Sequence, residues 1–365
     1  MKNTFGSSFS VTLFGESHGD MIGAVLDGVA PGIPIDHAYI EKQLRLRRPA
    51  GTISTARVEP DRYTIVSGVF NGKTTGTPLC ILIPNENKRS EDYTTDSFLP
   101  RPGHADLTGY NKYHGYEDRR GGGHFSGRLT APLVAVGAIA LTALRQRGIT
   151  VGTHIKCCAG IPDRDFRNAQ EDLALLNNSD FAVLDPEAAI KMKNAIEAAA
   201  ASGNSVGGVL ETCVCGLPCG VGEPWFDSVE SVLSHALFSI PAVKGVEFGA
   251  GFSICDMQGS QANDAMRWDA GGVRFLSNHN GGILGGISTG NDLIIRIAVK
   301  PTPSVFTEQE TVDLTKGQNA TLRLHGRHDP AIVHRARVVA DSVTALALCD
   351  LLALRYGTDW LRGAD

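Results

Sequence analysis

The sequence predicts an α/β fold made of two similar halves, because two patterns each occur twice. GAVLDGVAPGIP at Gly23–Pro34 matches GGVLETCVCGLP at Gly207–Pro218 in its glycine, valine, leucine and proline positions, and an amphipathic segment follows each copy. GVFNGKTTG at 68–76 resembles GILGGISTG at 282–290, and each runs into an apolar strand. Both pairs recur in the same order, so internal duplication explains them better than chance.

The repeats predict one pseudo-symmetric domain over residues 1–365. Its similar halves lie at about 1–150 and 205–365, and an insert at 151–204 joins them. A hydrophobic fraction of 42% with both charge signs mixed is typical of a globular protein that can bury a large core.

The elements follow from periodicity and capping residues. The first half is expected to contain strands at Phe9–Phe14, Ile22–Leu26, Tyr63–Phe70 and Leu79–Ile83, a helix from its cap Asp36 to about Arg48, and a helix at Pro132–Arg147 that Gly148 ends. The remainder is expected to contain a strand at Thr150–Ile155, a helix at Pro186–Ala201 with Asp185 as its cap, a helix from Asp227, and a helix at Asp341–Tyr356.

Composition excludes several classes of partner. A net charge of −5 argues against nucleic acid, which needs a broad basic surface. The apolar run Leu129–Leu144 contains Pro132 and Gly137 and falls short of the roughly 20 residues of a membrane span, so a buried helix is expected and no membrane partner. The N-terminus lacks the apolar core of a secretory signal, which with 8 cysteines favours a cytoplasmic location and free thiols.

A metal site is not expected. Cys213 and Cys215 alternate along a predicted strand and would face one side of it, but no CxxC pair or HxxxH motif completes a ligand set.

A glycine-rich basic segment at 101–132 is the strongest indication of a binding site. The triple glycine at 121–123 allows a ligand to approach the backbone, and amides that enter a helix bind anions. Arg128 adds fixed positive charge, as do Arg119 and Arg120, while His104 and His124 can exchange protons near neutral pH. The pattern favours an anionic small molecule, and a flexible basic surface loop is the alternative.

Ser17 and His18 form a second polar group, in the loop GESHG between the first two strands. A polar hairpin loop is the alternative interpretation. A hydrolase is a more distant one, because there is no G-x-S-x-G elbow and adjacent residues rarely have the geometry of nucleophile and base.

Two further groups could act on an anion. Arg45, Arg47 and Arg48 end the first helix with more positive charge than its dipole requires, which predicts a phosphate or carboxylate contact. Asp329, between His328 and Pro330, is a candidate carboxylate base, with an Asx-turn as the alternative.

The motifs GESHGDMIGAVLDGVAPGIP, RPGHAD, RGGGHFSGR, SIPAVKG, NHNGGILGGISTG, KPTPS and GRHDPAIVHRA together resemble the chorismate synthase family over nearly the whole chain. The resemblance implies a β-α-β sandwich, with a helical layer between two antiparallel sheets, and a homotetramer. It also implies a lyase that eliminates phosphate from 5-enolpyruvylshikimate-3-phosphate to give chorismate. The cofactor would be reduced FMN, with NADPH as a possible reductant.

The resemblance also implies residue roles. His18 would protonate the leaving phosphate, His104 would control protonation of the flavin, and Asp329 would act with the flavin in removing the ring proton. Ser17 and Ser126 would position the flavin and the proton path. The implied flavin contacts are Arg47, His124, Phe125, Ser126, Pro241, Ala242, Gly285, Lys300, Pro301, Thr302, Pro303, Ser304 and Arg327, and the implied substrate contacts are Arg48, Arg128 and Arg327.

Two positions depart from the family pattern. HFSGR replaces the usual RSSAR, which places His124 and Phe125 where the family has arginine and serine, and GTIS places Ser54 where the family often has arginine. We expect the same reaction with altered flavin or phosphate affinity. A non-catalytic protein that keeps only the binding site is the alternative, and retention of His18, His104 and Asp329 argues against it.

Overall fold

Two antiparallel five-stranded sheets form the outer layers of the computed structural model, which describes residues 2–49, 51–55, 60–86, 97–269, 271–324, 326 and 328–362. The first sheet contains, in spatial order, β1 (Thr4–Phe5), β2 (Ser10–Gly15), β3 (Met21–Asp27), β7 (Leu79–Pro84) and β4 (Thr64–Ser67). The second contains β11 (Val243–Phe248), β16 (Leu293–Val299), β10 (Gly208–Cys215), β8 (Thr150–Cys158) and β9 (Ile161–Pro162).

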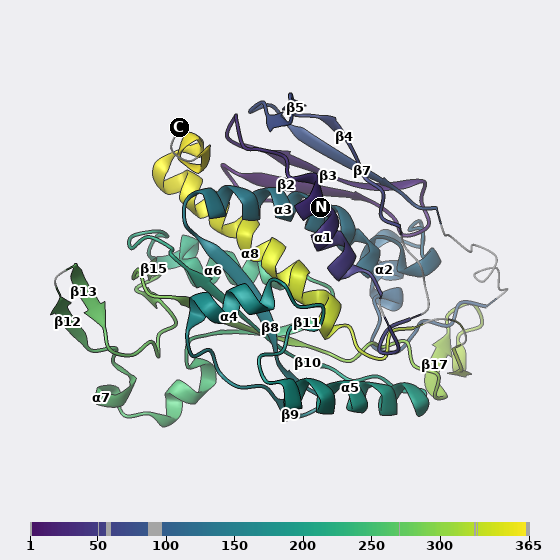
Figure 1. The fold of residues 1–365 in the computed structure, drawn as a ribbon. Helices are drawn as coiled ribbons and strands as arrows, with labels where there is room; N and C mark the ends of the chain where they lie inside the picture. The colour runs from purple at the N-terminus through teal and green to yellow at the C-terminus, as the bar shows by residue number, and fades with distance from the viewer. Residues whose placement is uncertain are drawn as a thin grey trace.

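Helices fill the space between the sheets, as Figure 1 shows. The central layer consists of α1 (His37–Arg47), α3 (Thr130–Gln146), α6 (Val229–Leu237) and α8 (Val333–Tyr356). The other helices are α2 (Asp106–Tyr113), α4 (Ala169–Leu176), α5 (Pro186–Ala201) and α7 (Gly259–Ala262). The predicted β-α-β sandwich is therefore confirmed.

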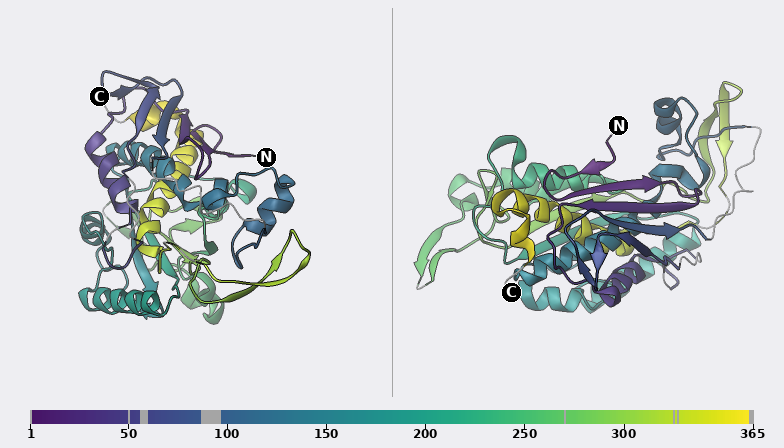
Figure 2. Two further views of the ribbon diagram at one scale, coloured as in Figure 1. Left: turned by 90° about the vertical axis from the view of Figure 1, so that its right-hand side faces the viewer. Right: turned by 90° about the horizontal axis from the view of Figure 1, so that it is seen from above.

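Two-stranded hairpins and 3₁₀ turns complete the fold. The hairpins are β5 (Val69–Phe70) with β6 (Lys73–Thr74), β12 (Met266–Asp269) with β13 (Gly272–Phe275), β14 (Ile283–Leu284) with β15 (Ile287–Ser288), and β17 (Gln309–Asp313) with β18 (Gln318–Leu322). The 3₁₀ turns are η2 (Arg120–Phe125), η3 (Gly127–Leu129), η4 (Trp225–Asp227), η5 (Gly251–Asp256) and η6 (Thr358–Arg362). The β17–β18 hairpin projects from the same side of the molecule as α2 (Figure 2).

The two halves share one topology, which confirms the predicted internal duplication. The strand order β2-β3-β7-β4 in the first sheet corresponds to β8-β10-β16-β11 in the second. The repeated glycine motifs form the equivalent hairpins β5–β6 and β14–β15. In one hairpin Thr74 Oγ1 donates to Ala30 O at 2.6 Å, and in the other Ser288 Oγ donates to Pro218 O at 2.6 Å.

The predicted boundary between the halves stays a prediction, although the topology favours a different one. β8 lies in the expected insert, yet it pairs with β10 as β2 pairs with β3. This pairing places β8 in the second half.

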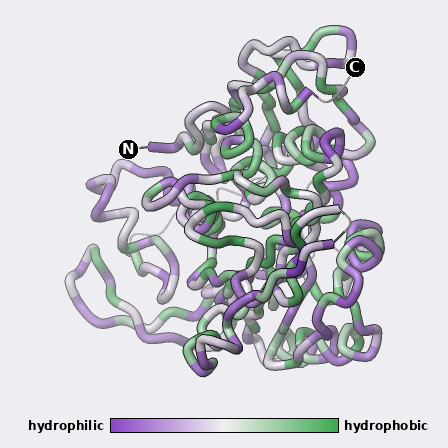
Figure 3. The backbone as a smooth tube through the Cα atoms, turned by 90° about the vertical axis from the view of Figure 1, so that its left-hand side faces the viewer, coloured by the Kyte–Doolittle hydropathy of each residue, from purple (hydrophilic) through white to green (hydrophobic). Residues whose placement is uncertain are grey.

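The core lies in the helical layer. α3 and α8 are buried along almost their whole lengths, and hydrophobic residues concentrate in the interior (Figure 3). Gly137 of α3 allows close approach to α8, because a Cβ there would lie 2.2 Å from Cβ of Ser342. Residues 127–146 are long and apolar enough to cross a membrane, but 89% of the tested window is buried inside the molecule. The expected buried helix is confirmed.

Several predicted elements need correction. α8 begins at Val333, eight residues before the predicted Asp341, because the polar residues in its first turns are themselves buried. α6 takes Ser228 rather than Asp227 as its N-cap. The predicted strand Tyr63–Phe70 is divided at Gly68, where φ is +82° and a Cβ would lie 2.5 Å from the Cα of Leu79.

Candidate active site

The triple glycine forms a turn that contacts two of the predicted histidines. Gly121, Gly122 and Gly123 have φ values of 61°, 85° and 54°, which favour glycine. A Cβ at Gly121 would lie 2.1 Å from Cε1 of His18, and one at Gly122 would lie 3.3 Å from Nε2 of His104. Because the turn has no side chains, both imidazoles can lie directly against its backbone.

Ser17 joins the same group. Its amide donates to Gly123 O at 3.1 Å, and its Oγ lies 2.9 Å from the position of a Cβ at Gly121. The side chain is buried, and within the described ranges its Oγ has no hydrogen-bond partner. A buried hydroxyl of this kind is available to a ligand.

Asn85 connects the Ser17–His18 loop to an arginine. Its Nδ2 donates to Glu16 O and Gly19 O, both at 3.0 Å, and its Oδ1 accepts from Arg128 Nε at 3.1 Å. Asn85 directly follows β7, so the first sheet fixes the position of the loop.

The residues of HFSGR hold the glycine turn in place. Nδ1 of His124 donates to Gly15 O at 2.8 Å, because a carbonyl only accepts. The ring of Phe125 lies 6.1 Å from that of Tyr113 in α2, and Ser126 caps the following 3₁₀ turn. These three residues, which are among the implied flavin contacts, therefore also have a structural role.

His104 is oriented by an acid and an arginine. Its Nδ1 donates to Asp106 Oδ1 at 2.6 Å, which leaves Nε2 facing the glycine turn. Arg101 binds both oxygens of Asp106, at 2.7 and 2.8 Å. Burial opposes ionisation, but the hydrogen bonds from Arg101 and His104 hold the pKa of Asp106 well below its ordinary value. The carboxylate therefore stays charged beside the imidazole.

The KPTPS loop packs against this group. Arg101 Nη1 donates to Ser304 Oγ at 3.4 Å, and Lys300 Nζ donates to Gly103 O. Lys300 N donates to Ala242 O at 3.0 Å, which brings the Pro241–Ala242 segment alongside. Within the described ranges Thr302 Oγ1 is buried without a hydrogen-bond partner, as Ser17 Oγ is.

Three predicted anion-binding arginines converge on one buried acid. Asp61 accepts from Arg47 Nη2 at 2.8 Å, from Arg48 Nε at 3.4 Å and from Arg128 Nη1. Burial alone would raise the pKa of Asp61, but the charges of Arg47 and Arg128 hold it below its ordinary value. Arg47 Nη1 also donates to Thr130 Oγ1 at 3.4 Å, at the start of α3.

Asp329 belongs to a third group of contacts. Its Oδ1 accepts from the amide of Thr55 at 3.0 Å, and its Oδ2 accepts from Arg335. Arg335 Nε donates to Arg47 O at 2.8 Å, which connects this group to the arginine cluster. Among the described residues, Arg335 in the first turn of α8 is therefore a cationic partner of Asp329.

Gly285 lies in a different loop from the KPTPS segment, and its implied flavin contact stays a prediction. It lies in the turn of the β14–β15 hairpin, before β16, whereas Lys300 follows β16. Arg327 lies outside the described residues.

A separate cluster could bind a metal. Ligand atoms of Cys213, Cys215 and Asp292 lie within 4.8 Å of one another, and the two thiols face one side of β10, as predicted. Asp292 was not foreseen. The thiols lie in the apolar cluster beside α4, away from the glycine turn.

The fold and the site define an α/β enzyme class in which histidines, hydroxyls and arginines surround a glycine turn, an arrangement that suits an anionic small molecule. The chain belongs to the chorismate synthase family, whose model matches residues 9–353.

Relatives and a solved structure agree with this assignment. The chain is 45% identical to the chorismate synthase of Methanosarcina mazei over 97% of each chain. It is 46% identical to that of Chitinophaga pinensis over 96% of this chain and 97% of the relative. A crystal structure of chorismate synthase has a TM-score of 0.77 and 29% identity, and the match covers 97% of this chain and 94% of the other. The predicted family, a family of lyases, is thereby confirmed.

Proposed function

We propose that this chain eliminates phosphate from 5-enolpyruvylshikimate-3-phosphate to give chorismate, with reduced FMN as its cofactor. The observation that carries the proposal is the convergence of Ser17, His18 and His104 on the glycine turn. The reaction breaks a ring C–O bond and removes a ring proton. It therefore needs groups that supply and accept protons close to an anion site.

The residues present fit a bound flavin. The buried hydroxyls of Ser17 and Thr302 have no hydrogen-bond partner in the described part of the chain, and the glycine turn exposes its backbone. The KPTPS loop and the Pro241–Ala242 segment would hold the cofactor beside His104. Reduced FMN, when bound, supplies an electron-rich ring next to the substrate.

The remaining chemistry belongs to side chains. His18 would donate a proton to the leaving phosphate oxygen, and Asp329 would accept the ring proton. Arg48 and Arg128, fixed by Asp61, would bind the phosphate or carboxylates of the substrate. A proton-transfer group of this kind contributes about 10²–10⁴-fold to rate.

The proposal extends to the cellular form of the enzyme. We propose a cytoplasmic homotetramer that uses FMN reduced elsewhere, with NADPH as the ultimate reductant. The compact chain, without evident extra insertions, supports the dependence on external reduction.

Substituting His18 with Asn tests the assignment. Phosphate release should fall by about 10²–10⁴-fold while the substrate still binds. Release at the wild-type rate would remove His18 from the proton path.

A further inference from the structure

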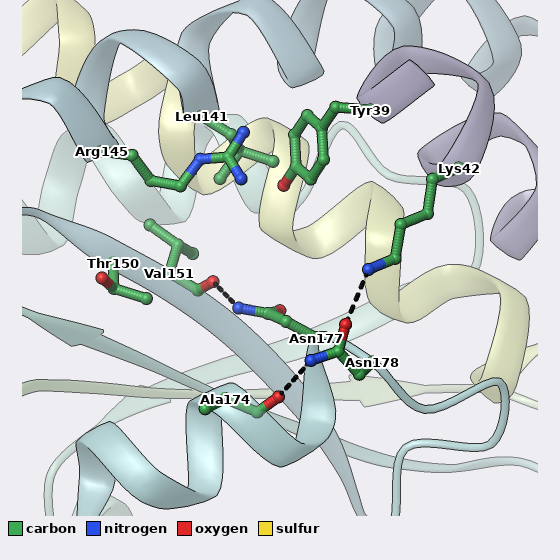
Figure 4. Close-up of a pocket in the computed structure, with 9 residues that line it drawn as sticks. All are labelled: Tyr39, Lys42, Leu141, Arg145, Thr150, Val151, Ala174, Asn177 and Asn178. Carbon is green, nitrogen blue, oxygen red and sulfur yellow. Dashed lines mark hydrogen bonds between the residues drawn. The ribbon is translucent and has the colours of Figure 1, made fainter. Parts of the chain in front are cut away.

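A cavity of about 230 Å³ lies at the edge of the helical layer, in a different place from the candidate active site. It opens between α1, the end of α3, the start of β8 and the end of α4 (Figure 4). Its lining residues are Tyr39, Lys42, Leu141, Arg145, Thr150, Val151, Ala174, Asn177 and Asn178.

The charged side chains in the lining of the cavity are all cationic. Lys42 and Arg145 are its charged lining residues, and none of the nine is acidic. Lys42 Nζ donates to Asn178 Oδ1 at 3.0 Å, and Arg145 Nη2 donates to Thr142 Oγ1 at 3.2 Å, so both cations bind neutral oxygens. Each keeps further N–H donors.

The fold holds these donors in place. The guanidinium carbon of Arg145 lies 3.8 Å from the centre of the Tyr39 ring, and the side-chain amide of Asn178 bridges Lys42 and Ala174 O (Figure 4). Asn177 Nδ2 donates to Val151 O at 3.3 Å. The hydroxyl of Tyr39 is protonated at neutral pH and can donate, and burial raises its pKa further, to about 12.

We infer that this cavity is a second anion site, which binds the phosphate group of a small molecule. Two cations without an acid match a group that carries between one and two negative charges at neutral pH, as a phosphate monoester or inorganic phosphate does. The volume is smaller than that of a typical drug-sized pocket, which limits the ligand to a small one.

The position of the cavity connects it to the candidate active site. α1 carries Lys42 in its middle and Arg47 at its end, while α3 ends near Arg145 and begins at Thr130. Arg47 Nη1 donates to Thr130 Oγ1 at 3.4 Å, so the same two helices line the cavity and meet again at the arginine cluster.

Lysine labelling of the full-length protein tests the inference locally. Reductive methylation, followed residue by residue with mass spectrometry, should be slower at Lys42 when inorganic phosphate is present. The fold slowdown should rise as 1 + [phosphate]/Kd, reaching about fivefold where phosphate is about four times its Kd, as one-site occupancy requires. Lys191, exposed on α5, should not change, and Lys300 reports separately on the proposed active site.

Variants and salts make the outcome decisive. Arg145→Met should abolish protection of Lys42. Arg355→Met is the matched control, because Arg355 also lies in the last turn of a helix near a tyrosine. It should leave the protection of Lys42 unchanged, because Arg355 does not line the cavity. Equal protection by chloride at the same ionic strength, or no protection at Lys42, would overturn the inference. Protection by phosphate alone would identify the free ion, and protection also by glycerol 3-phosphate would identify a phosphate ester.

Discussion

Asp106 gives His104 its orientation, and replacing it tests that role. Asp106→Asn would remove the charged acceptor at Nδ1 and weaken the pair with Arg101. We expect kcat to fall by about 10- to 100-fold with a smaller change in KM, because the imidazole remains but its tautomer is no longer fixed. Asp180→Asn, which removes an exposed pair with Arg45, should leave kcat unchanged. An unchanged kcat in Asp106→Asn would contradict the role.

Gly121 tests whether the turn must lie against His18. Gly121→Ala places a Cβ 2.1 Å from Cε1 of His18 at a φ of +61°, so stability and activity should both fall. Gly72→Ala is a matched control, because its φ is +72° and nothing lies within 4 Å. The control should lose about 1–2 kcal/mol from backbone strain alone and keep its activity. Urea unfolding and kcat measure both, and equal losses would contradict the contact.

His124 tests the departure from the family pattern. His124→Arg restores a charge but removes the hydrogen bond to Gly15 O. If the missing charge weakens flavin binding, the substitution should tighten FMN in a fluorescence titration. An unchanged FMN affinity would mean that the departure has no consequence for the flavin.

At the residue scale the sequence indicated reactive groups but not their partners. His18, His104 and the triple glycine stand out because of their chemistry and spacing. Asp61, Asn85 and Asp106 do not, since a carboxylate or amide is common in any sequence. Their roles arise from contacts across the fold, such as that between Asp61 and Arg128.

At the element scale, a buried network on β8 and β10 gives a pH dependence. His154 Nδ1 lies 2.7 Å from Asp163 Oδ2, and its Nε2 lies 3.0 Å from Glu211 Oε1. Burial alone would lower the pKa of His154, but hydrogen bonds to the two carboxylates raise it above 6.5. Asp163 also accepts from the amides of Leu184 and Asp185, which anchors the start of α5.

The sign of the effect follows from this shift. A histidine whose pKa is higher in the folded than in the unfolded state contributes its full stabilisation at pH values below the unfolded pKa of 6.5. This contribution is lost as the pH rises through the higher pKa of the folded state. The free energy of unfolding should therefore decline above about pH 6.5, and the decline should be weaker in His154→Gln. His37→Gln, at an exposed histidine, should retain it. A wild-type profile in His154→Gln would contradict the account.

Elements with strong local signals were predicted, and elements without them were not. α1 and α5 begin at the predicted caps Asp36 and Asp185. α2 was missed because its sequence DLTGYNKY is polar and buries little, and α4 because it lies in a polar connector. Their positions are set by tertiary contacts, such as the packing of Phe125 on Gly109.

For the whole molecule, duplication explains the sandwich. Each half contributes one sheet and the helices that cover its inner face, so the two halves meet through α3 and α8. The repeated motifs revealed this plan, but they did not predict which half contains β8. Neither β8 nor the equivalent strand β2 lies within a repeated segment.

The central claim is that the chain is a lyase dependent on reduced FMN. The most direct test measures phosphate and chorismate formed from 5-enolpyruvylshikimate-3-phosphate under anaerobic conditions, with chemically reduced FMN and no NADPH. Equal amounts of phosphate and chorismate over many turnovers are expected, with no turnover on oxidised FMN. Tight FMN binding without turnover would contradict the claim and favour a protein that only binds the flavin.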